Sequence, residues 1–267
     1  MRVPATIGSH SVCMDDGEED LKRQFENAKQ DVSSLGGWQA FKSGDWLLAL
    51  ITRSFRNYYE RATKEYFERK YAGKDPAFIR KKLISVASRN AAVVGALTGA
   101  AVTADEVVAL VTGAEAGIGL PANIAIAATA VAAESVLLIR LQLQLVAQLA
   151  RLSGVPLDPD DPEDILTIIA FAIGGSAAEA AGKSGMKIGG RAAGNLVKKY
   201  VSKETLTALK ALGRKVGLKI LQKQLIKYTI PIVSIGIGGG WNYMTTRAVA
   251  RVAEKHLAAR KRDLGGD

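Results

Sequence analysis

Two rows of basic residues are the feature of this sequence most suited to a specific chemistry. The residues recur at spacings of four and are Lys215, Lys219, Lys223 and Lys227, then Arg247, Arg251 and Lys255. Residues four apart lie on the same side of a helix, so each row predicts a cationic face opposite an apolar one. Such a face attracts an anionic membrane surface, at about 1 kcal/mol for each basic residue. A solvated face on a soluble bundle is the alternative interpretation.

An uncharged segment, residues 228–246, separates the two rows and has Trp241 and Tyr243 near its end. Aromatic rings with a polar edge favour the boundary between lipid headgroups and acyl chains. We therefore predict that the two basic rows, Trp241 and Tyr243 contact a membrane or another anion. Nucleic acid is disfavoured as a partner, because the sequence has no zinc-finger spacing and few aromatic residues among the basic ones to stack on bases.

The sequence contains few residues that could bind a metal or a cofactor. One Cys and two His exclude a Cys-based zinc site and leave little for His-centred acid–base catalysis. The acidic residues between 158 and 164 lack the central Gly and distant Glu of a calcium loop, and fit the start of a helix instead. The glycines between 236 and 240 lack the Lys and Ser/Thr that complete a phosphate-binding loop. We expect no metal, no cofactor and no catalytic residue.

One carboxylate, Glu134, allows hydrolase activity as an alternative function. Glu134 ends an uncharged stretch of 18 residues, 116–133, in Ala- and Gly-rich surroundings. Buried carboxylates can serve as acid and base in bond cleavage. More often such a group pairs with an arginine, and Arg89, Arg140 and Arg151 are available for that role.

The net charge of +10 is unevenly distributed along the 267 residues. Residues 182–262 carry +16, whereas residues 88–181 carry −7. Hydrophobic residues form 48% of the chain and charged residues 23%, which is typical of globular proteins and excludes collagen-like and wholly disordered classes. The single Cys fits a reducing compartment, so we expect a cytoplasmic protein.

Helix signals recur along the chain, and no alternating strand pattern competes with them. Residues from Ser43 to Phe67 are predicted to form one helix with Ser43 as its cap, and Asp75-Pro76 is typical of another helix start. Gly154 marks a helix end. The sequence therefore predicts an all-α fold.

Two uncharged segments, 116–133 and 228–246, approach the length of a membrane span. Pro121 and Asn123 interrupt the first segment, and Pro231 and the following glycines interrupt the second. We therefore predict Gly/Pro-broken helical hairpins rather than continuous spans. Glycine pairs four residues apart predict close helix packing, so the expected fold is a multi-helix bundle with Ala/Gly-rich hydrophobic helices.

The chain divides into three predicted parts. Residues 1–36 form a polar, flexible N-terminal leader without the pattern of a signal peptide, residues 37–262 form the helical domain, and residues 263–267 form a tail.

Three stretches of the helical domain resemble a known family. They are GLPANI at 119–124, RLQLQLVAQLARLSGVPLDPDDPED at 140–164 and IPIVSIGIGGGWNYMTTRAVARVAEKHLAAR at 230–260. Together they resemble the EcsC family, bacterial proteins named for a component encoded with an ABC transporter, over residues 77–262. The family pattern is matched at Pro121, Pro231 and Asn242, to which we assign structural roles. The sequence departs from it at Ala122 and Ser153.

The resemblance implies a helical, hydrophobic and membrane-associated protein without an established activity. Combined with the charge distribution, it leads to the hypothesis of a non-enzymatic protein, peripheral to the inner face of the cell membrane. Its basic C-terminal third would bind anionic lipids, and it would be accessory to a transporter. The alternatives are a soluble helical module that binds an apolar ligand or a protein partner, and a hydrolase that uses buried carboxylates.

Overall fold

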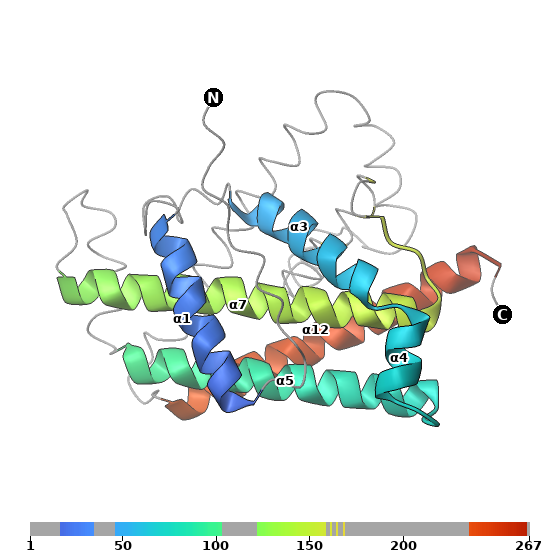
Figure 1. Ribbon diagram of the computed structural model, residues 1–267, viewed down its shortest axis with the longest axis horizontal. Helices are drawn as coiled ribbons and strands as arrows, with labels where there is room; N and C mark the ends of the chain where they lie inside the picture. Colours follow the sequence, from blue (N-terminus) through green and yellow to red (C-terminus); the bar gives the residue numbers. More distant parts are fainter. Residues whose placement is uncertain are drawn as a thin grey trace, which may run out of the picture.

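The computed structural model describes residues 17–34, 46–102, 122–158, 161, 164, 168 and 235–265. Within these ranges the chain forms six helices and no strand, so the prediction of an all-α bundle is confirmed (Figure 1). The helices are α1 (Glu18–Ser34), α3 (Trp46–Arg61), α4 (Lys64–Lys70), α5 (Pro76–Ala101), α7 (Ala122–Ser153) and α12 (Ile235–Asp263).

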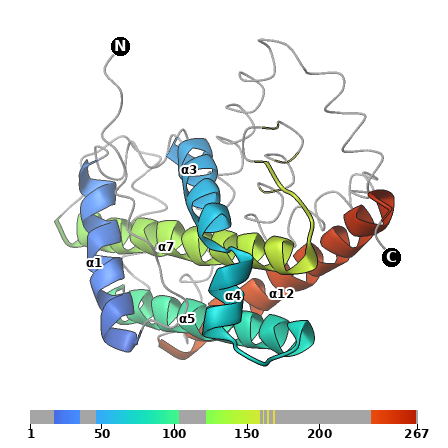
Figure 2. The same ribbon diagram turned by 45° about the vertical axis from the view of Figure 1, so that its right-hand side comes forward.

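α7 is the central helix of the bundle and packs against α1, α3, α5 and α12. Every residue from Ala130 to Ala150 is buried, because this stretch is mostly apolar around its whole circumference. α1 and α3 cross α7 at a steep angle, whereas α5 and α12 run along it (Figures 1 and 2). The hydrophobic core therefore consists of α7 and the inner sides of its four neighbours.

Two helices in the described ranges are long and apolar enough to cross a membrane, judged by length and composition alone: Pro76–Ala101 and Ala125–Ser153. The most apolar 18 residues of the second are 89% buried inside the bundle, and those of the first are 56% buried. A core helix of a soluble protein has the same properties, so this finding is only weakly compatible with membrane association.

Two helix ends follow the local signals in the sequence. Asp75 caps α5, and its carboxylate accepts a hydrogen bond from the Phe78 N–H at 2.7 Å. Gly154 ends α7 with a φ of 69°, which a residue with a side chain rarely adopts, and the Val155 N–H donates to the Ala150 carbonyl at 3.0 Å. Both ends depend on residues within a few positions of each other.

The predicted single helix from Ser43 to Phe67 is wrong. α3 ends at Arg61 and α4 starts at Lys64, because the Thr63 hydroxyl accepts a hydrogen bond from the N–H three residues later, at 3.2 Å. This bond caps a new helix, so the chain can change direction between the two. Ser43 itself lies outside the described residues.

The predicted helix break at the glycines 236–240 is also wrong. α12 includes these glycines in its first turns and continues without a break. α7 begins at Ala122 and includes Asn123, whereas Pro121 and Pro231 lie outside the described residues. The glycine run remains helical because it packs closely on α5, where Gly238 leaves no space for a side chain on the facing Gly95. The run is therefore a close-contact surface rather than a helix break.

The predicted leader of residues 1–36 contains one described helix. Its described part is α1, whose Leu21, Phe25 and Val32 are buried in the bundle. Arg140 of α7 also forms an ion pair with Asp31 of α1, at 3.3 Å. These contacts make α1 part of the helical domain.

Candidate functional site

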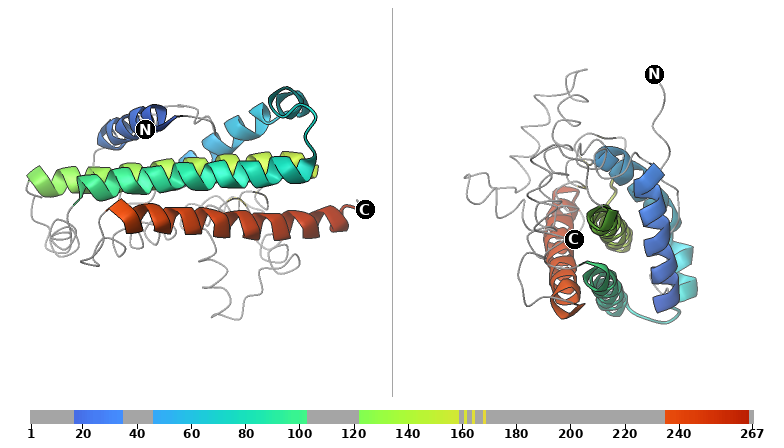
Figure 3. Two further views of the ribbon diagram at one scale, coloured as in Figure 1. Left: turned by 90° about the horizontal axis from the view of Figure 1, so that it is seen from below. Right: turned by 90° about the vertical axis from the view of Figure 1, so that its left-hand side faces the viewer.

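α5 and α12 lie side by side and antiparallel, and together they form a two-helix surface (Figure 3). Their closest approach is at glycines, since a side chain at Gly95 would overlap the backbone of Gly238. Farther along the pair, the Arg80 guanidinium of α5 lies 3.5 Å from the Glu254 carboxylate of α12. The predicted close packing of helices at glycines is confirmed at this crossing.

One side of α12 is exposed along most of its length. The exposed positions, three or four residues apart, are Trp241, Met244, Arg247, Arg251, Lys255 and Ala258. Met244 is 62% exposed and Trp241 is 41% exposed, which are high values for large apolar side chains. This side of α12 therefore combines exposed apolar residues with the second basic row.

α5 adds three exposed cations, Lys81, Lys82 and Arg89. Because α5 and α12 each bury the side that packs on α7, their exposed sides both turn away from α7. The exposed sides of both helices therefore carry cations. We call this set of cations the basic face and define it by Lys81, Lys82, Arg89, Arg247, Arg251 and Lys255.

Acidic groups near the basic face are few. α5 has no acidic residue, and α12 has only Glu254, which pairs with Arg80, and Asp263 at its end. Among the residues that the structure describes, Arg251 and Lys255 have no acidic partner. Within the described ranges, the positive charge of this face is therefore largely uncompensated.

Arg247 and Tyr243 form a fixed pair one helical turn apart. The Arg247 guanidinium donates a hydrogen bond to the Tyr243 hydroxyl at 3.0 Å and lies 5.6 Å from the centre of its ring. This contact orients the guanidinium without neutralising it, so the charge of Arg247 still contributes to the basic face.

Asn242 lies on the opposite side of α12 and is buried in the core. Its amide nitrogen donates to the Glu134 carboxylate of α7 at 2.6 Å, and both side chains have 0% exposure. A Cβ atom at Gly95 would lie 2.7 Å from the same amide nitrogen. Glu134 therefore joins the helices at the glycine crossing, and it has no exposed surface with which to meet a substrate.

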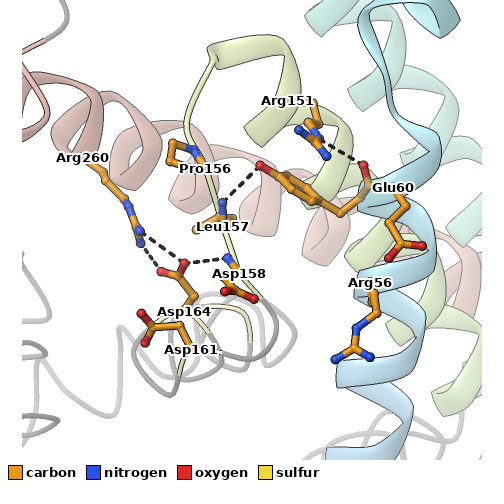
Figure 4. Close-up of a pocket in the computed structure, with 10 residues that line it drawn as sticks. Arg56, Glu60, Arg151, Pro156, Leu157, Asp158, Asp161, Asp164 and Arg260 are labelled. Atoms are coloured by element: carbon orange, nitrogen blue, oxygen red, sulfur yellow. Dashed lines mark hydrogen bonds and ion pairs between the residues drawn. The ribbon is translucent and has the colours of Figure 1, made fainter.

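An open pocket of about 560 Å³ lies where α7 ends (Figure 4). Three of its charged side chains contact each other or the backbone: Arg260 donates to both carboxylate oxygens of Asp164, and Asp164 accepts from the Asp158 N–H at 2.7 Å. Arg151 donates to the Tyr59 carbonyl at 3.1 Å. The lining consists of Arg56, Tyr59, Glu60, Arg151, Pro156, Leu157, Asp158, Asp161, Asp164 and Arg260.

These contacts join the chain after α7 to α12 and indicate a structural role. Asp164 has the acidic character expected at a helix start, and it binds a guanidinium. No group of three or more metal-binding side chains occurs in the described ranges. His256 lies one turn before Arg260. Burial lowers the pKa of His256, as does the positive charge of Arg260, whereas the Asp164 carboxylate raises it.

The structure describes only part of the predicted site. Trp241, Tyr243, Arg247 and Arg251 lie on the exposed side of α12 or at its edge, and Asn242 lies in the core. Outside the described residues are Lys215, Lys219, Lys223, Lys227, Pro121 and Pro231.

The α5 cations were not predicted from the sequence as part of the site. Segment 76–101 carries four basic residues and no acidic one, a bias that could have indicated them. Their position beside α12, however, follows from helix packing and has no signal in the local sequence.

Comparisons of the chain with models of known protein families, with curated protein sequences and with solved structures return no match.

Proposed function

We propose that the protein is a non-enzymatic, peripheral membrane protein that binds anionic lipids on the cytoplasmic face of the cell membrane. The observation that carries this proposal is the basic face: its α12 cations lie on the same exposed side of that helix as Trp241 and Met244, and the adjacent helix α5 carries further exposed cations. A helix pair with cations and exposed apolar side chains on its outer side fits the membrane interface. The resemblance to the EcsC family favours the same function.

The charge of the basic face is sufficient for reversible binding. Its six cations, at about 1 kcal/mol each, would contribute about 6 kcal/mol at low salt, which corresponds to a dissociation constant of roughly 40 μM. Salt screens such charges over about 8 Å at physiological ionic strength, so the binding should weaken as salt is added. The basic residues between 182 and 234 lie outside the described residues and are not included here.

Vesicle flotation of the full chain tests the proposal. The protein should float with phosphatidylglycerol vesicles and much less with phosphatidylcholine vesicles at low salt. A triple variant, Arg89→Gln, Arg251→Gln and Lys255→Gln, should bind roughly 100-fold more weakly, because three contributions of about 1 kcal/mol are lost.

A matched control removes the same number of charges elsewhere. Arg53, Arg61 and Arg69 are exposed on α3 and α4 and are not part of the basic face. Their combined replacement by Gln should change vesicle binding much less than the first triple variant does. Equal losses in both triple variants would contradict the assignment to the basic face, and absence of binding by the parent protein would refute the proposal and favour a soluble module.

A further inference from the structure

We propose that α12 meets the bilayer at an angle, with its N-terminal end among the acyl chains and its C-terminal half at the headgroups. This inference rests on the proposed function and adds an orientation to it. The first observation is the change of chemistry along the exposed side of α12. Trp241 and Met244 come first, and the cations Arg247, Arg251 and Lys255 follow toward the C-terminus.

α5 shows the same change in the opposite chain direction. Its exposed cations end at Arg89, and the following residues, Asn90–Ala101, carry no charge. Because α5 and α12 are antiparallel and cross at Gly95 and Gly238, the uncharged end of α5 lies beside the apolar end of α12 (Figure 3). The two-helix surface thus has an apolar end and a cationic end.

The Tyr243–Arg247 pair lies at the boundary between these two ends. Tyr and Arg are the residues expected at headgroup level, the first through its amphipathic ring and the second through its charge. Trp241 precedes this pair, Met244 lies within the turn that it spans, and Arg251 and Lys255 follow it toward the C-terminus. A helix that lay flat on the membrane would instead hold all of these side chains at similar depths.

The partner that fits this surface is an anionic bilayer. A nucleic acid would match the cations but would leave Met244 and Trp241 in water, whereas a bilayer offers a charged layer and an apolar layer only a few ångströms apart. The order of side chains along α12 matches the order of these two layers.

Depth measurements with spin labels on the full chain test the inference. The single native cysteine, Cys13, is replaced by Ser, and one label is placed by Met244→Cys or Ala258→Cys. Both positions are exposed on the same side of α12 and lie 14 residues apart, about 21 Å along the helix. With phosphatidylglycerol vesicles, we expect the ratio of oxygen collisions to nickel-chelate collisions to be several-fold higher at position 244 than at 258.

A second pair of labels on α5 provides an independent check. Ala100→Cys lies at its uncharged end and Ser85→Cys at its cationic end, and both positions are exposed. The collision ratio of the label at 100 should resemble the ratio at 244. The ratio at 85 should resemble the ratio at 258. Each labelled protein should unfold at the same urea concentration as the unlabelled parent.

The possible results separate this inference from the function on which it rests. Equal, shallow depths at both positions of each pair, in protein that floats with the vesicles, would refute the oblique orientation and leave surface binding intact. Unchanged label spectra and no flotation would refute both proposals.

Discussion

Replacing Gly95 by alanine tests the close packing of α5 on α12. A methyl group at this position would overlap the Gly238 carbonyl, which belongs to the backbone of a helix and cannot rotate away. It would also lie 2.7 Å from the amide nitrogen of Asn242, which donates to Glu134. The two helices must therefore move apart locally, and the buried hydrogen bond must weaken.

The expected loss of stability is the balance of three effects. Inserting a methyl group into a well-packed contact costs about 1–3 kcal/mol, and weakening a buried hydrogen bond adds about 1–3 kcal/mol. Alanine stabilises a helix interior by about 1 kcal/mol relative to glycine, which offsets part of this loss. We expect the free energy of unfolding to fall by about 1–5 kcal/mol, and the melting temperature to fall by about 2–4 °C for each kcal/mol.

Urea unfolding followed by far-ultraviolet circular dichroism measures this change. The matched control is Gly240→Ala on α12, where no atom lies within 4 Å of an added Cβ. Helix propensity alone should stabilise that variant, by about 0.5–1 kcal/mol. If Gly95→Ala also unfolds at a higher urea concentration than the parent, the close glycine crossing is wrong.

Two further predictions concern the contacts between α12 and the chain after α7. Burial lowers the pKa of His256 in the folded protein. Below about pH 6.5, His256 is therefore protonated more readily in the unfolded chain, and the free energy of unfolding should fall. His256→Gln should therefore lose less stability than the parent between pH 7.5 and 5.5, and an equal loss in urea titrations would contradict the burial effect. Asp164→Asn should destabilise by about 1–3 kcal/mol, because the Arg260 charge loses its partner but remains partly exposed to water. Glu68→Gln, at an exposed carboxylate paired with Lys64, should cost less than about 0.5 kcal/mol in the same measurement.

The helix ends show which parts of the fold local sequence could predict. Asp75 and Gly154 were identified because a cap depends only on the residue type and on neighbours within one turn. Thr63 was missed, since the apolar spacing continues across it and hides the start of a new helix. The glycines at the start of α12 were expected to break a helix, and they remain helical because α5 packs directly on them.

The candidate site was only partly predictable for the same reason. Arg247 and Arg251 were identified from helical spacing, and the structure places both on the exposed side of α12. Asn242 was known only as a motif residue, and its hydrogen bond to Glu134 joins positions 108 residues apart in the chain. No local pattern indicates a contact of that separation.

By itself, the sequence determined that this chain is helical and that its positive charge is concentrated toward the C-terminus. Both properties follow from residue types and from spacings shorter than two helical turns. Only the tertiary structure decided that α5, which carries Lys81, Lys82 and Arg89, packs beside α12, which carries Arg251 and Lys255. The physical reason is that α5 and α12 approach closely where glycines meet, and this contact sets which side of each helix remains exposed to the solvent.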